Sequence, residues 1–507
     1  MPKPLKKSEK KSELLLDGRS LKLQDVWQVA RNLELEVKIH PKAIKQIQNS
    51  KKCVDKVLAQ NSAVYGINTG FGLLSSVRIP KAKLSQLQVN LIRSHAAGVG
   101  TPLSIPEVRA MILLRANNLV AGFSGVSVEL IESLLGLLNK GVHPYIPEQG
   151  SVGASGDLAP LAHLSLTLIG EGRCFYKGEL TTAEKALKSA KLKPYKLKPK
   201  EGLALINGTQ AMTAIGALVL EKAERLTKLS DLASAMSLEA CLGSEKPFAP
   251  EISNVRPHKG QIEVARNLRN LLSGSEIMKS HHLCKRVQDP YSFRCIPQVH
   301  GACRDLIKQA RKTVEIEINS VTDNPLVFAK TGKIISGGNF HGEYIAFAMD
   351  QLAIGVAELA DISDQRIQKL INPHFSEGLP PFLVKDSGLN SGFMIVQYAS
   401  AALVSENKVL CHPASVDSIP TSADKEDHVS MGTIAARKAR NVVENTWNVI
   451  AIEMLCATQG IDFRRPLKSS TKINQAYSKI RSVVSFLEED RVLHDDILKI
   501  TCKMWEL

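Results

Sequence analysis

Ser155 is a candidate for covalent chemistry because of the residues that surround it. It lies in the segment Gly150-Ser-Val-Gly-Ala-Ser-Gly-Asp-Leu-Ala-Pro-Leu-Ala-His163. A serine hydrolase typically places its nucleophile in a G-x-S-x-G turn that follows a β-strand. Here Asp157 stands where the last glycine is needed, and the segment follows a loop punctuated by proline. The sequence therefore does not predict a serine hydrolase.

Other motifs that would bring a cofactor or a metal are absent from the sequence. There is no GxxxxGK[ST] phosphate loop and no GxGxxG at the start of a βαβ unit. His281-His282-Leu283-Cys284 is metal-like in composition, but no second cluster stands at ligand spacing. We interpret these histidines as exposed or packing residues and expect no metal.

Apolar periodicity indicates a mainly α-helical protein. Ile345, Met349, Leu352, Val356 and Leu359 recur at spacings of four and three, which is one stripe of a long helix. Two further helices are expected over 210–242 and 427–458, and several such helices indicate a bundle. We expect a loop-rich N-terminal part over 13–205 and a helical core with C-terminal helices over 206–507. The uncharged runs 202–220 and 387–405 are expected to be buried helices or walls of a site, since polar residues interrupt both and argue against membrane spans.

The formal net charge is +15, and two lysine-rich segments carry much of it. Residues 1–12 contain five lysines and residues 177–200 contain eight, without the interleaved aromatics of a base-stacking surface. We expect a disordered basic tail and a solvated surface segment, with nucleic-acid binding the lesser alternative. The nine cysteines form no CxxC pair, and the N-terminus has no apolar signal segment. Both observations indicate a cytoplasmic protein.

Seven segments, taken together and in order, resemble the MIO-dependent histidine and aromatic amino acid ammonia-lyase family. They are Tyr65–Gly72, Ser94–Gly98, Gly150–His163, Glu201–Gln210, Val287–Arg294, Ser336–His341 and Glu426–Met431. The resemblance covers about residues 60 to 470. It implies a fumarase/aspartase-like helical core and a homotetramer whose sites draw residues from more than one chain. It also implies that Ala154, Ser155 and Gly156 cyclise to 4-methylideneimidazole-5-one (MIO), with no external cofactor.

The residue types in this tripeptide suit that cyclisation. The Gly156 nitrogen would attack the Ala154 carbonyl, and water would then be lost, including the Ser155 hydroxyl. Glycine has no Cβ and reaches the backbone angles that a tight ring closure needs. The reaction requires such a group because the substrate amine leaves poorly and no ordinary side chain is a strong electrophile. An ordinary glycine–serine turn is the alternative for an isolated Ala-Ser-Gly.

The resemblance also implies roles for acid–base residues. Tyr65 would be the catalytic base near the β-carbon, which requires a positive field because an unperturbed tyrosine has a pKa of about 10. Glu426 would face the substrate and share acid–base duty. Tyr291 would stabilise the MIO ring or its amine adduct. A packed tyrosine with a bonded hydroxyl is the structural alternative for Tyr65.

Further residues are implied in substrate binding. Arg294 would hold the substrate carboxylate with its planar fork, and a surface salt bridge is the alternative. Asn207 and Gln288 would supply polar contacts, while Phe340 would pack against the MIO. A helix cap for Asn207 and core packing for Phe340 are the corresponding alternatives.

One departure from the family pattern precedes Glu426. Many bacterial relatives have Asn-Gln where this chain has Asp424-Lys425. A nearby lysine would depress the pKa of Glu426 if it pointed inward, or would simply point to solvent. Asp427 and His428 could instead cap the following helix.

The pair Ser94-His95 matches the histidine-specific branch, whereas aromatic-specific relatives tend to have His-Leu or Phe-Leu there. The expected reaction is therefore elimination of ammonia from L-histidine to give trans-urocanate, the first step of histidine degradation. A tyrosine or phenylalanine ammonia-lyase or an MIO-dependent aminomutase is the first alternative. A catalytically inactive helical scaffold, or a nucleic-acid-binding protein, is the second.

Overall fold

The computed structural model describes residues 13–60, 64–70, 72, 77–282 and 286–507. The predicted basic tail 1–12 and Cys284 lie outside the described residues. The chain divides into two compact units. Unit 1 comprises residues 1–218, 312–349 and 414–437, and unit 2 comprises residues 219–311, 350–413 and 438–507.

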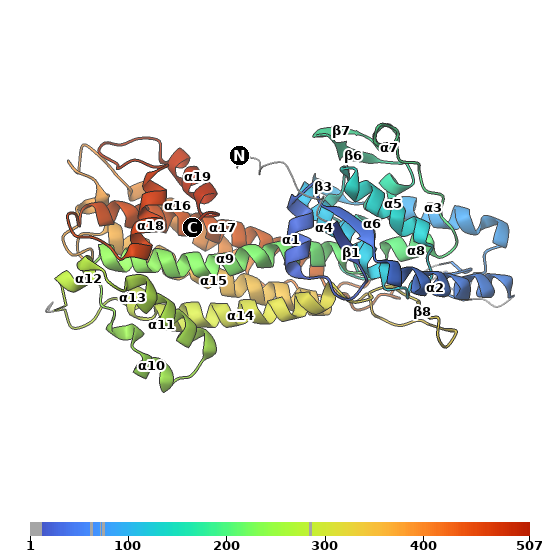
Figure 1. Ribbon diagram of the computed structural model, residues 1–507, viewed down its shortest axis with the longest axis horizontal. Coiled ribbons are helices and arrows are strands. Elements are labelled where there is room, and N and C mark those ends of the chain that lie inside the picture. The colour runs from blue at the N-terminus through green and yellow to red at the C-terminus, as the bar shows by residue number, and fades with distance from the viewer. Residues whose placement is uncertain (1–12, 61–63, 71, 73–76, 283–285) are drawn as a thin grey trace. The chain divides into compact units, whose positions relative to one another are not determined.

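Unit 1 combines helices with four small sheets (Figure 1). Strand β1 pairs in parallel with β2, β3 pairs with β5, β4-β6-β7 form an antiparallel sheet, and β8 pairs with β9. Its elements are β1 Glu13–Leu16, α1 Leu23–Arg31, β2 Glu36–Ile39, α2 Pro41–Ala59, the 3-10 helix Lys81–Lys83, α3 Leu84–His95, β3 Val99–Pro102, α4 Ile105–Val120, α5 Val128–Asn139, β4 Val142–Pro144, β5 Pro147–Gln149, α6 Leu158–Leu168, β6 Arg173–Tyr176, β7 Glu179–Thr182, α7 Ala183–Ala190, α8 Glu201–Ile206, β8 Leu326–Phe328 and β9 Lys333–Ile335.

Unit 2 is helical over its described residues. The long helices α9 Gln210–Ala240, α14 Ile296–Glu317, α15 Glu343–Ile371 and α17 Gly432–Asp462 have residues in both units. The remaining elements of unit 2 are the 3-10 helix Lys246–Phe248, α10 Pro250–Asn254, α11 Lys259–Leu272, α12 Glu276–Ser280, α13 Tyr291–Arg294, the 3-10 helix Pro381–Leu383, α16 Met394–Leu410, α18 Thr471–Arg481 and α19 Leu493–Lys503.

The long helices confirm the mainly helical fold that periodicity predicted. All five residues of the predicted apolar stripe lie in α15 and are 0% exposed. Helix α9 ends close to the predicted bound, because Leu242 adopts a φ of +49° and the Gly243 amide donates to the Leu238 carbonyl at 2.8 Å. Helix α17 begins at Gly432, after Met431 with a φ of +54°. The alternative in which Asp427 and His428 cap this helix is therefore wrong.

The two uncharged runs behave differently. Residues 202–220 are buried in α8 and at the start of α9, apart from a partly exposed Leu218, as predicted. The part of the prediction that buries 387–405 is not met within this chain, because Leu389 is 87%, Ile395 61% and Tyr398 60% exposed, while the role as a wall of a site stays a prediction. Helix α16 packs its other face through Val396 and Ser400, so the lack of charge does not reflect burial within the chain. We call the exposed side chains of Ile395, Tyr398 and Val409 the α16 apolar face.

The sequence predicts a solvated surface segment over 177–200. The structure corrects this prediction at its last residue, Lys200. Lys200 is fully buried in unit 1 and forms an ion pair with Asp323 at 2.6 Å, with both side chains 0% exposed. Burial lowers the pKa of Lys200, and the Asp323 carboxylate opposes that effect. A buried charge must be paired because its desolvation costs free energy. Lys200 therefore neutralises the buried Asp323 carboxylate inside unit 1.

Asp157 connects three segments of unit 1. One carboxylate oxygen accepts from the Ala211 and Met212 amides at 2.8 and 2.9 Å, which are free donors in the first turn of α9. The other oxygen accepts from the hydroxyls of Thr433 and Ser151. The carboxylate thereby fixes the loop before α6 to the N-termini of α9 and α17, and a negative charge is favourable at a helix N-terminus.

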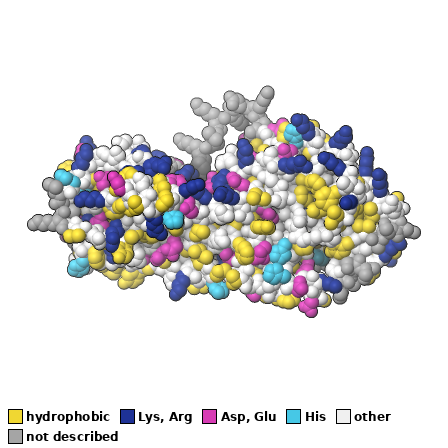
Figure 2. Space-filling model, turned by 90° about the horizontal axis from the view of Figure 1, so that it is seen from below, with side chains coloured by type: hydrophobic (Ala, Val, Ile, Leu, Met, Phe, Trp, Pro, Cys, Tyr) yellow, Lys and Arg dark blue, Asp and Glu magenta, His cyan; other side chains and the backbone are white. Residues whose placement is uncertain are grey.

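No helix within the described parts of the chain is long and apolar enough to cross a membrane. On the face drawn in Figure 2, Lys and Arg side chains are dispersed among Asp and Glu. That face shows no continuous basic stripe of the kind that tracks a nucleic-acid backbone.

We predict that Lys200→Met destabilises the protein by about 3–5 kcal/mol, because it leaves the buried Asp323 carboxylate without its partner. The matched control is Lys198→Met, whose exposed ion pair with Glu129 at 3.3 Å should contribute about 1 kcal/mol or less. Urea denaturation of both variants measures the difference. Equal destabilisation by the two substitutions would contradict the assignment.

We predict that Asp157 makes stability fall with rising pH over a defined window. Burial raises the pKa of this carboxyl to about 6 from 3.8, so the folded state favours the protonated form. The free energy of unfolding of wild type minus that of Asp157→Asn should decrease as pH rises from about 4 to about 6, and then level. The total change should be on the order of 3 kcal/mol, at about 1.4 kcal/mol per pKa unit. Denaturation of both proteins across this range measures it, and a difference that stays flat or rises would refute the prediction.

Candidate active site

The loop that carries Ser155 has glycines where side chains would not fit. Gly153 and Gly156 have φ angles of +74° and +76°, which L side chains rarely adopt. Gly156 forms a bridge with Gly208, and a Cβ on Gly156 would lie 2.3 Å from the Gly208 carbonyl oxygen. Ala154 is 8% exposed, and Ser155 is half-buried. The backbone is therefore held in a tight turn that exposes the serine and excludes larger residues at 156.

Glu426 lies directly against this turn. The Ser155 hydroxyl donates to Glu426 Oε1 at 2.5 Å, and the Thr421 hydroxyl donates to Oε2 at 3.0 Å. The backbones of Thr421 and Glu426 also exchange two hydrogen bonds of 3.0 and 3.2 Å. The preceding Lys425 is exposed and forms no ion pair with the residues that the structure describes. Of the two orientations considered for this lysine, the solvent-facing one is observed.

Tyr65 and His95 both lie within the electrostatic field of Glu426. Burial raises the pKa of Tyr65 most, the Glu426 and Asp323 carboxylates add to the rise, and a hydrogen bond with the Gly72 backbone opposes it. This direction is opposite to the activation that a catalytic base needs, because burial and, to a lesser extent, the Glu426 and Asp323 carboxylates disfavour the tyrosinate. Burial lowers the pKa of His95, while the Leu91 carbonyl and Glu426 oppose that shift.

The contacts of His95 define which of its nitrogens is free. The Ser94 hydroxyl donates to the Leu91 carbonyl at 3.1 Å and lies 3.0 Å from His95 Nδ1. The Ser94 hydroxyl has one proton, and it is used in the bond to the Leu91 carbonyl. In the contact between Ser94 and His95, the donor is therefore the Nδ1–H of His95 and the acceptor is the Ser94 oxygen. The neutral ring then has a lone pair at Nε2, for which no hydrogen bond is made with the described residues.

Asn207 lies at the C-terminal end of α8, close behind the Ser155 loop. Its carbonyl accepts from the buried Arg115 at 2.8 Å, and its Nδ2 donates to the Asn324 carbonyl at 3.4 Å. Its Oδ1 is buried and has no hydrogen-bond partner in the described part of the chain. Asn207 therefore both caps α8 and retains one acceptor, so the structural and functional alternatives coexist.

Phe340 is half-buried in the loop between β9 and α15. Asn324 Oδ1 anchors the start of this loop, where it accepts from the Ser336 hydroxyl at 3.1 Å and the Gly337 amide at 2.8 Å. Unit 1 thus contains eight of the eleven predicted site residues: Tyr65, His95, Ala154, Ser155, Gly156, Asn207, Phe340 and Glu426.

Gln288, Tyr291 and Arg294 belong to unit 2 and surround the start of α13. Gln288 is exposed, and Tyr291 is 70% exposed. The Arg294 guanidinium lies over the Tyr291 ring at 4.2 Å, and its Nε is buried without a hydrogen-bond partner among the described residues. The surface salt bridge considered for Arg294 is not observed there.

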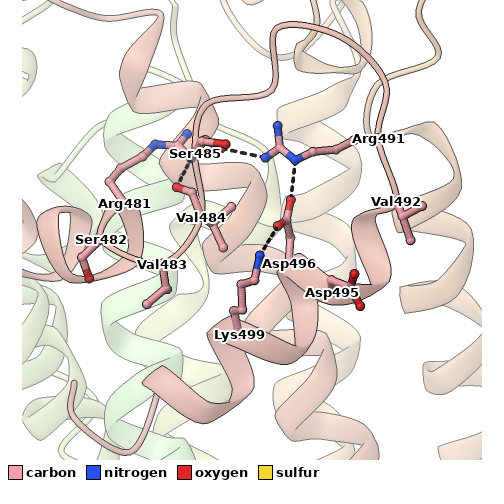
Figure 3. Close-up of a pocket in the computed structure, with 10 residues that line it drawn as sticks. All are labelled: Arg481, Ser482, Val483, Val484, Ser485, Arg491, Val492, Asp495, Asp496 and Lys499. Carbon is pink, nitrogen blue, oxygen red and sulfur yellow. Dashed lines mark hydrogen bonds and ion pairs between the residues drawn. The ribbon is translucent and has the colours of Figure 1, made fainter.

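Two other features do not belong to this group. His281 contacts the Ile277 and Gly243 carbonyls at 2.8 Å through its two nitrogens, which agrees with a packing role. A cavity of about 560 Å³ lies between α18 and α19 in unit 2, where Arg491 and Lys499 both pair with Asp496 at 2.9 and 3.5 Å (Figure 3). Arg491, Lys499 and Asp496 thus pair with one another, and no predicted site residue lines the cavity.

Asp157 and Thr421 are parts of the site that no motif in the sequence indicated. Asp157 immediately follows the tripeptide, but apart from Ser151 its hydrogen-bond partners Ala211, Met212 and Thr433 stand more than 50 residues away. Thr421 is five residues from Glu426 and is brought to it by a short backbone pair that no motif indicates.

Comparison with known proteins shows the family to which the chain belongs. The aromatic amino acid lyase family matches residues 21–482. The chain is 55% identical to the histidine ammonia-lyase of Myxococcus xanthus over 484 residues, which is 96% of this chain and 95% of that protein. It resembles the crystal structure of histidine ammonia-lyase from Trypanosoma cruzi with a TM-score of 0.91 and 47% identity, covering 97% of this chain and 93% of that one. It also resembles tyrosine aminomutase from Streptomyces globisporus with a TM-score of 0.91 and 39% identity, covering 97% of both chains. The chain therefore belongs to the aromatic amino acid lyase family.

Proposed function

We propose that this protein eliminates ammonia from L-histidine to give trans-urocanate, as a carbon–nitrogen lyase. Identity of about 55% to histidine ammonia-lyases over nearly the whole chain supports this reaction. The observation that carries it is the position of His95, whose free Nε2 belongs to the same cluster as Glu426 and the Ser155 turn. An aromatic hydrocarbon side chain would not need such a partner, whereas an imidazole does.

We further propose that Ala154, Ser155 and Gly156 form MIO. The positive φ of Gly156, its contact with Gly208 and the tight turn at Ala154–Ser155 fit a backbone ring closure. The Glu426 carboxylate accepts a hydrogen bond from the Ser155 hydroxyl at 2.5 Å, so in its protonated form this carboxyl would be within reach to give a proton to the hydroxyl that leaves as water. When formed, MIO supplies the strong electrophile that the twenty side chains lack.

In this proposal Tyr65 removes the β-proton and Glu426 exchanges protons beside it. The raised pKa of Tyr65 keeps its hydroxyl protonated in the chain without substrate. The α-ammonium of a bound amino acid would offset the Glu426 charge and so favour the tyrosinate. The proposal therefore assigns the activation of Tyr65 to the substrate-bound state and not to the resting one.

His95 binds the substrate imidazole in this proposal. Its Nε2 lone pair accepts the N–H of a neutral imidazole, while Ser94 and Leu91 keep its other nitrogen engaged. Asn207, with its free buried Oδ1, supplies a further polar contact, and Phe340 packs against the MIO. Burial keeps His95 neutral, because it lowers the pKa.

We propose that the protein is a cytoplasmic homotetramer with active sites shared between subunits. The uncharged α16 apolar face supports subunit contact, since its side chains are 60% exposed or more in the single chain. Arg294, with its unpartnered buried Nε, would bind the substrate carboxylate, with Gln288 and Tyr291 beside it. The cysteines that the structure describes are all free, as a reducing compartment requires.

Ser155→Ala tests the origin of the electrophile. We expect the variant to fold and assemble but to lose nearly all urocanate formation, because alanine cannot lose a hydroxyl. Wild-type protein incubated with L-histidine should develop urocanate absorbance, and its intact mass should be lower than the sequence mass by two waters. Thr421→Ser, which keeps the Glu426 hydrogen bond, is the matched control and should retain the mass loss. Full activity at an unmodified mass would refute the MIO proposal, and a modified protein that makes no urocanate would refute histidine as substrate.

The double substitution Ser94→Phe/His95→Leu tests substrate choice against the tyrosine and phenylalanine alternatives. It removes the imidazole partner and should lower kcat/KM for histidine by 100-fold or more, which corresponds to about 2.7 kcal/mol. The mass loss and the melting temperature should stay close to wild type, since the hydrogen bonds of Ser94 and His95 run to the Leu91 carbonyl and to each other and not to the Ser155 turn. Phenylalanine and tyrosine are assayed alongside. Undiminished histidine turnover would remove the basis for preferring histidine.

A further inference from the structure

His341, Glu343 and His428 form a cluster in unit 1 that the proposed reaction does not use. One possible ligand atom from each residue lies within 4.8 Å of the other two. His341 and Glu343 lie at the start of α15, and His428 lies in the loop before α17, 87 residues away from His341 in sequence. The two imidazole rings are stacked, with centroids 5.6 Å apart and planes inclined by 6°.

The hydrogen bonding of this cluster leaves two acceptors facing each other. His341 Nε2 lies 3.3 Å from the His428 carbonyl, which can only accept, so this nitrogen carries the proton. In the neutral ring His341 Nδ1 then has a lone pair, and it lies 3.8 Å from Glu343 Oε2. That carboxylate oxygen is buried and has no hydrogen-bond partner in the described residues. Two lone pairs at this separation repel unless a positive charge lies between them.

We propose that His341, Glu343 and His428 bind a divalent transition-metal cation of the zinc class. Two imidazoles and one carboxylate are a ligand set that zinc uses, with water in a fourth position. Hard cations such as Mg²⁺ prefer all-oxygen sites, so the imidazoles select a borderline metal. The contact of His341 Nε2 with a backbone carbonyl is the kind of outer contact that orients a metal-binding histidine.

The distances require little rearrangement. Zinc–ligand bonds of about 2.0–2.2 Å place two ligands of a tetrahedral ion about 3.4 Å apart. The His341–Glu343 pair at 3.8 Å is already near this value. His428 is exposed, so its ring can turn to shorten the remaining separations of up to 4.8 Å.

Such a cation would connect the two loops that carry Phe340 and Glu426. His341 directly follows Phe340, and His428 stands two residues after Glu426. The metal would therefore act as a positioning element for these loops, outside the reacting atoms. Metal binding by His341, Glu343 and His428 does not depend on the substrate proposed above, because none of these three residues has a role in that reaction.

The test is calorimetric titration of Zn²⁺ into untagged full-length protein stripped with a chelator. Wild type should bind one ion per chain, and His341→Ala, His428→Ala and Glu343→Gln should each weaken binding at least ten-fold. The control His374→Ala removes an exposed histidine elsewhere and should bind as wild type does. Co²⁺ in place of zinc should give visible absorption bands of a nitrogen–oxygen tetrahedral site that the three variants lose.

Thermal melting without metal shows whether each variant is folded, and Glu343→Gln keeps the shape of its side chain. Absence of tight binding to wild type overturns the proposal. Equal affinity of wild type and the three folded variants overturns it as well, because the ion would then bind elsewhere.

Discussion

A single buried carboxylate, that of Asp157, determines where the Ser155 turn lies. Its four hydrogen-bond donors come from Ser151, the first turn of α9 and Thr433 at the start of α17. Two of these donors are backbone amides that a helix N-terminus leaves free, so the side chain satisfies the first turn of α9 while it positions the loop. The Asp157 amide also donates to the Gly208 carbonyl at 2.8 Å. The turn is thus fixed from outside, and its own residues remain available for chemistry.

Interior polar contacts extend this arrangement through unit 1. Arg115 binds the Asn207 carbonyl and Gln210, and Lys200 neutralises Asp323 beside Asn324. Asn324 in turn anchors the loop that bears Phe340. Because every one of these groups is buried, each depends on its hydrogen-bond partners. Loss of one partner should therefore also displace the other members of this network. Rigidity of this kind suits a site whose small displacement would harm catalysis.

The sequence predicted the helical core because burial of α15 follows directly from spacing, and all five stripe residues are buried. It also predicted the site segments, since each is a local run of residues. It could not predict partners that meet only in space, such as Lys200 with Asp323 or His341 with His428. The uncharged run in α16 was misassigned because absence of charge indicates burial without saying whether this chain or another provides it. The catalytic and binding roles of all eleven predicted site residues stay predictions.

The contact between Gly156 and Gly208 limits how this family member can change by mutation. A side chain at 156 would meet the backbone of 208, with the carbonyl carbon at 2.5 Å, and no second mutation can remove a backbone atom. A side chain at 208 would meet side-chain atoms of Arg115, Gln210 and Thr322, so trimming them could in principle make room. Shortening these side chains would remove the buried hydrogen bonds of Arg115 and Gln210 that the interior of unit 1 depends on. Position 156 is therefore closed to substitution by backbone atoms, and position 208 is restricted by its neighbours and also by its φ of +154°, which L side chains rarely adopt.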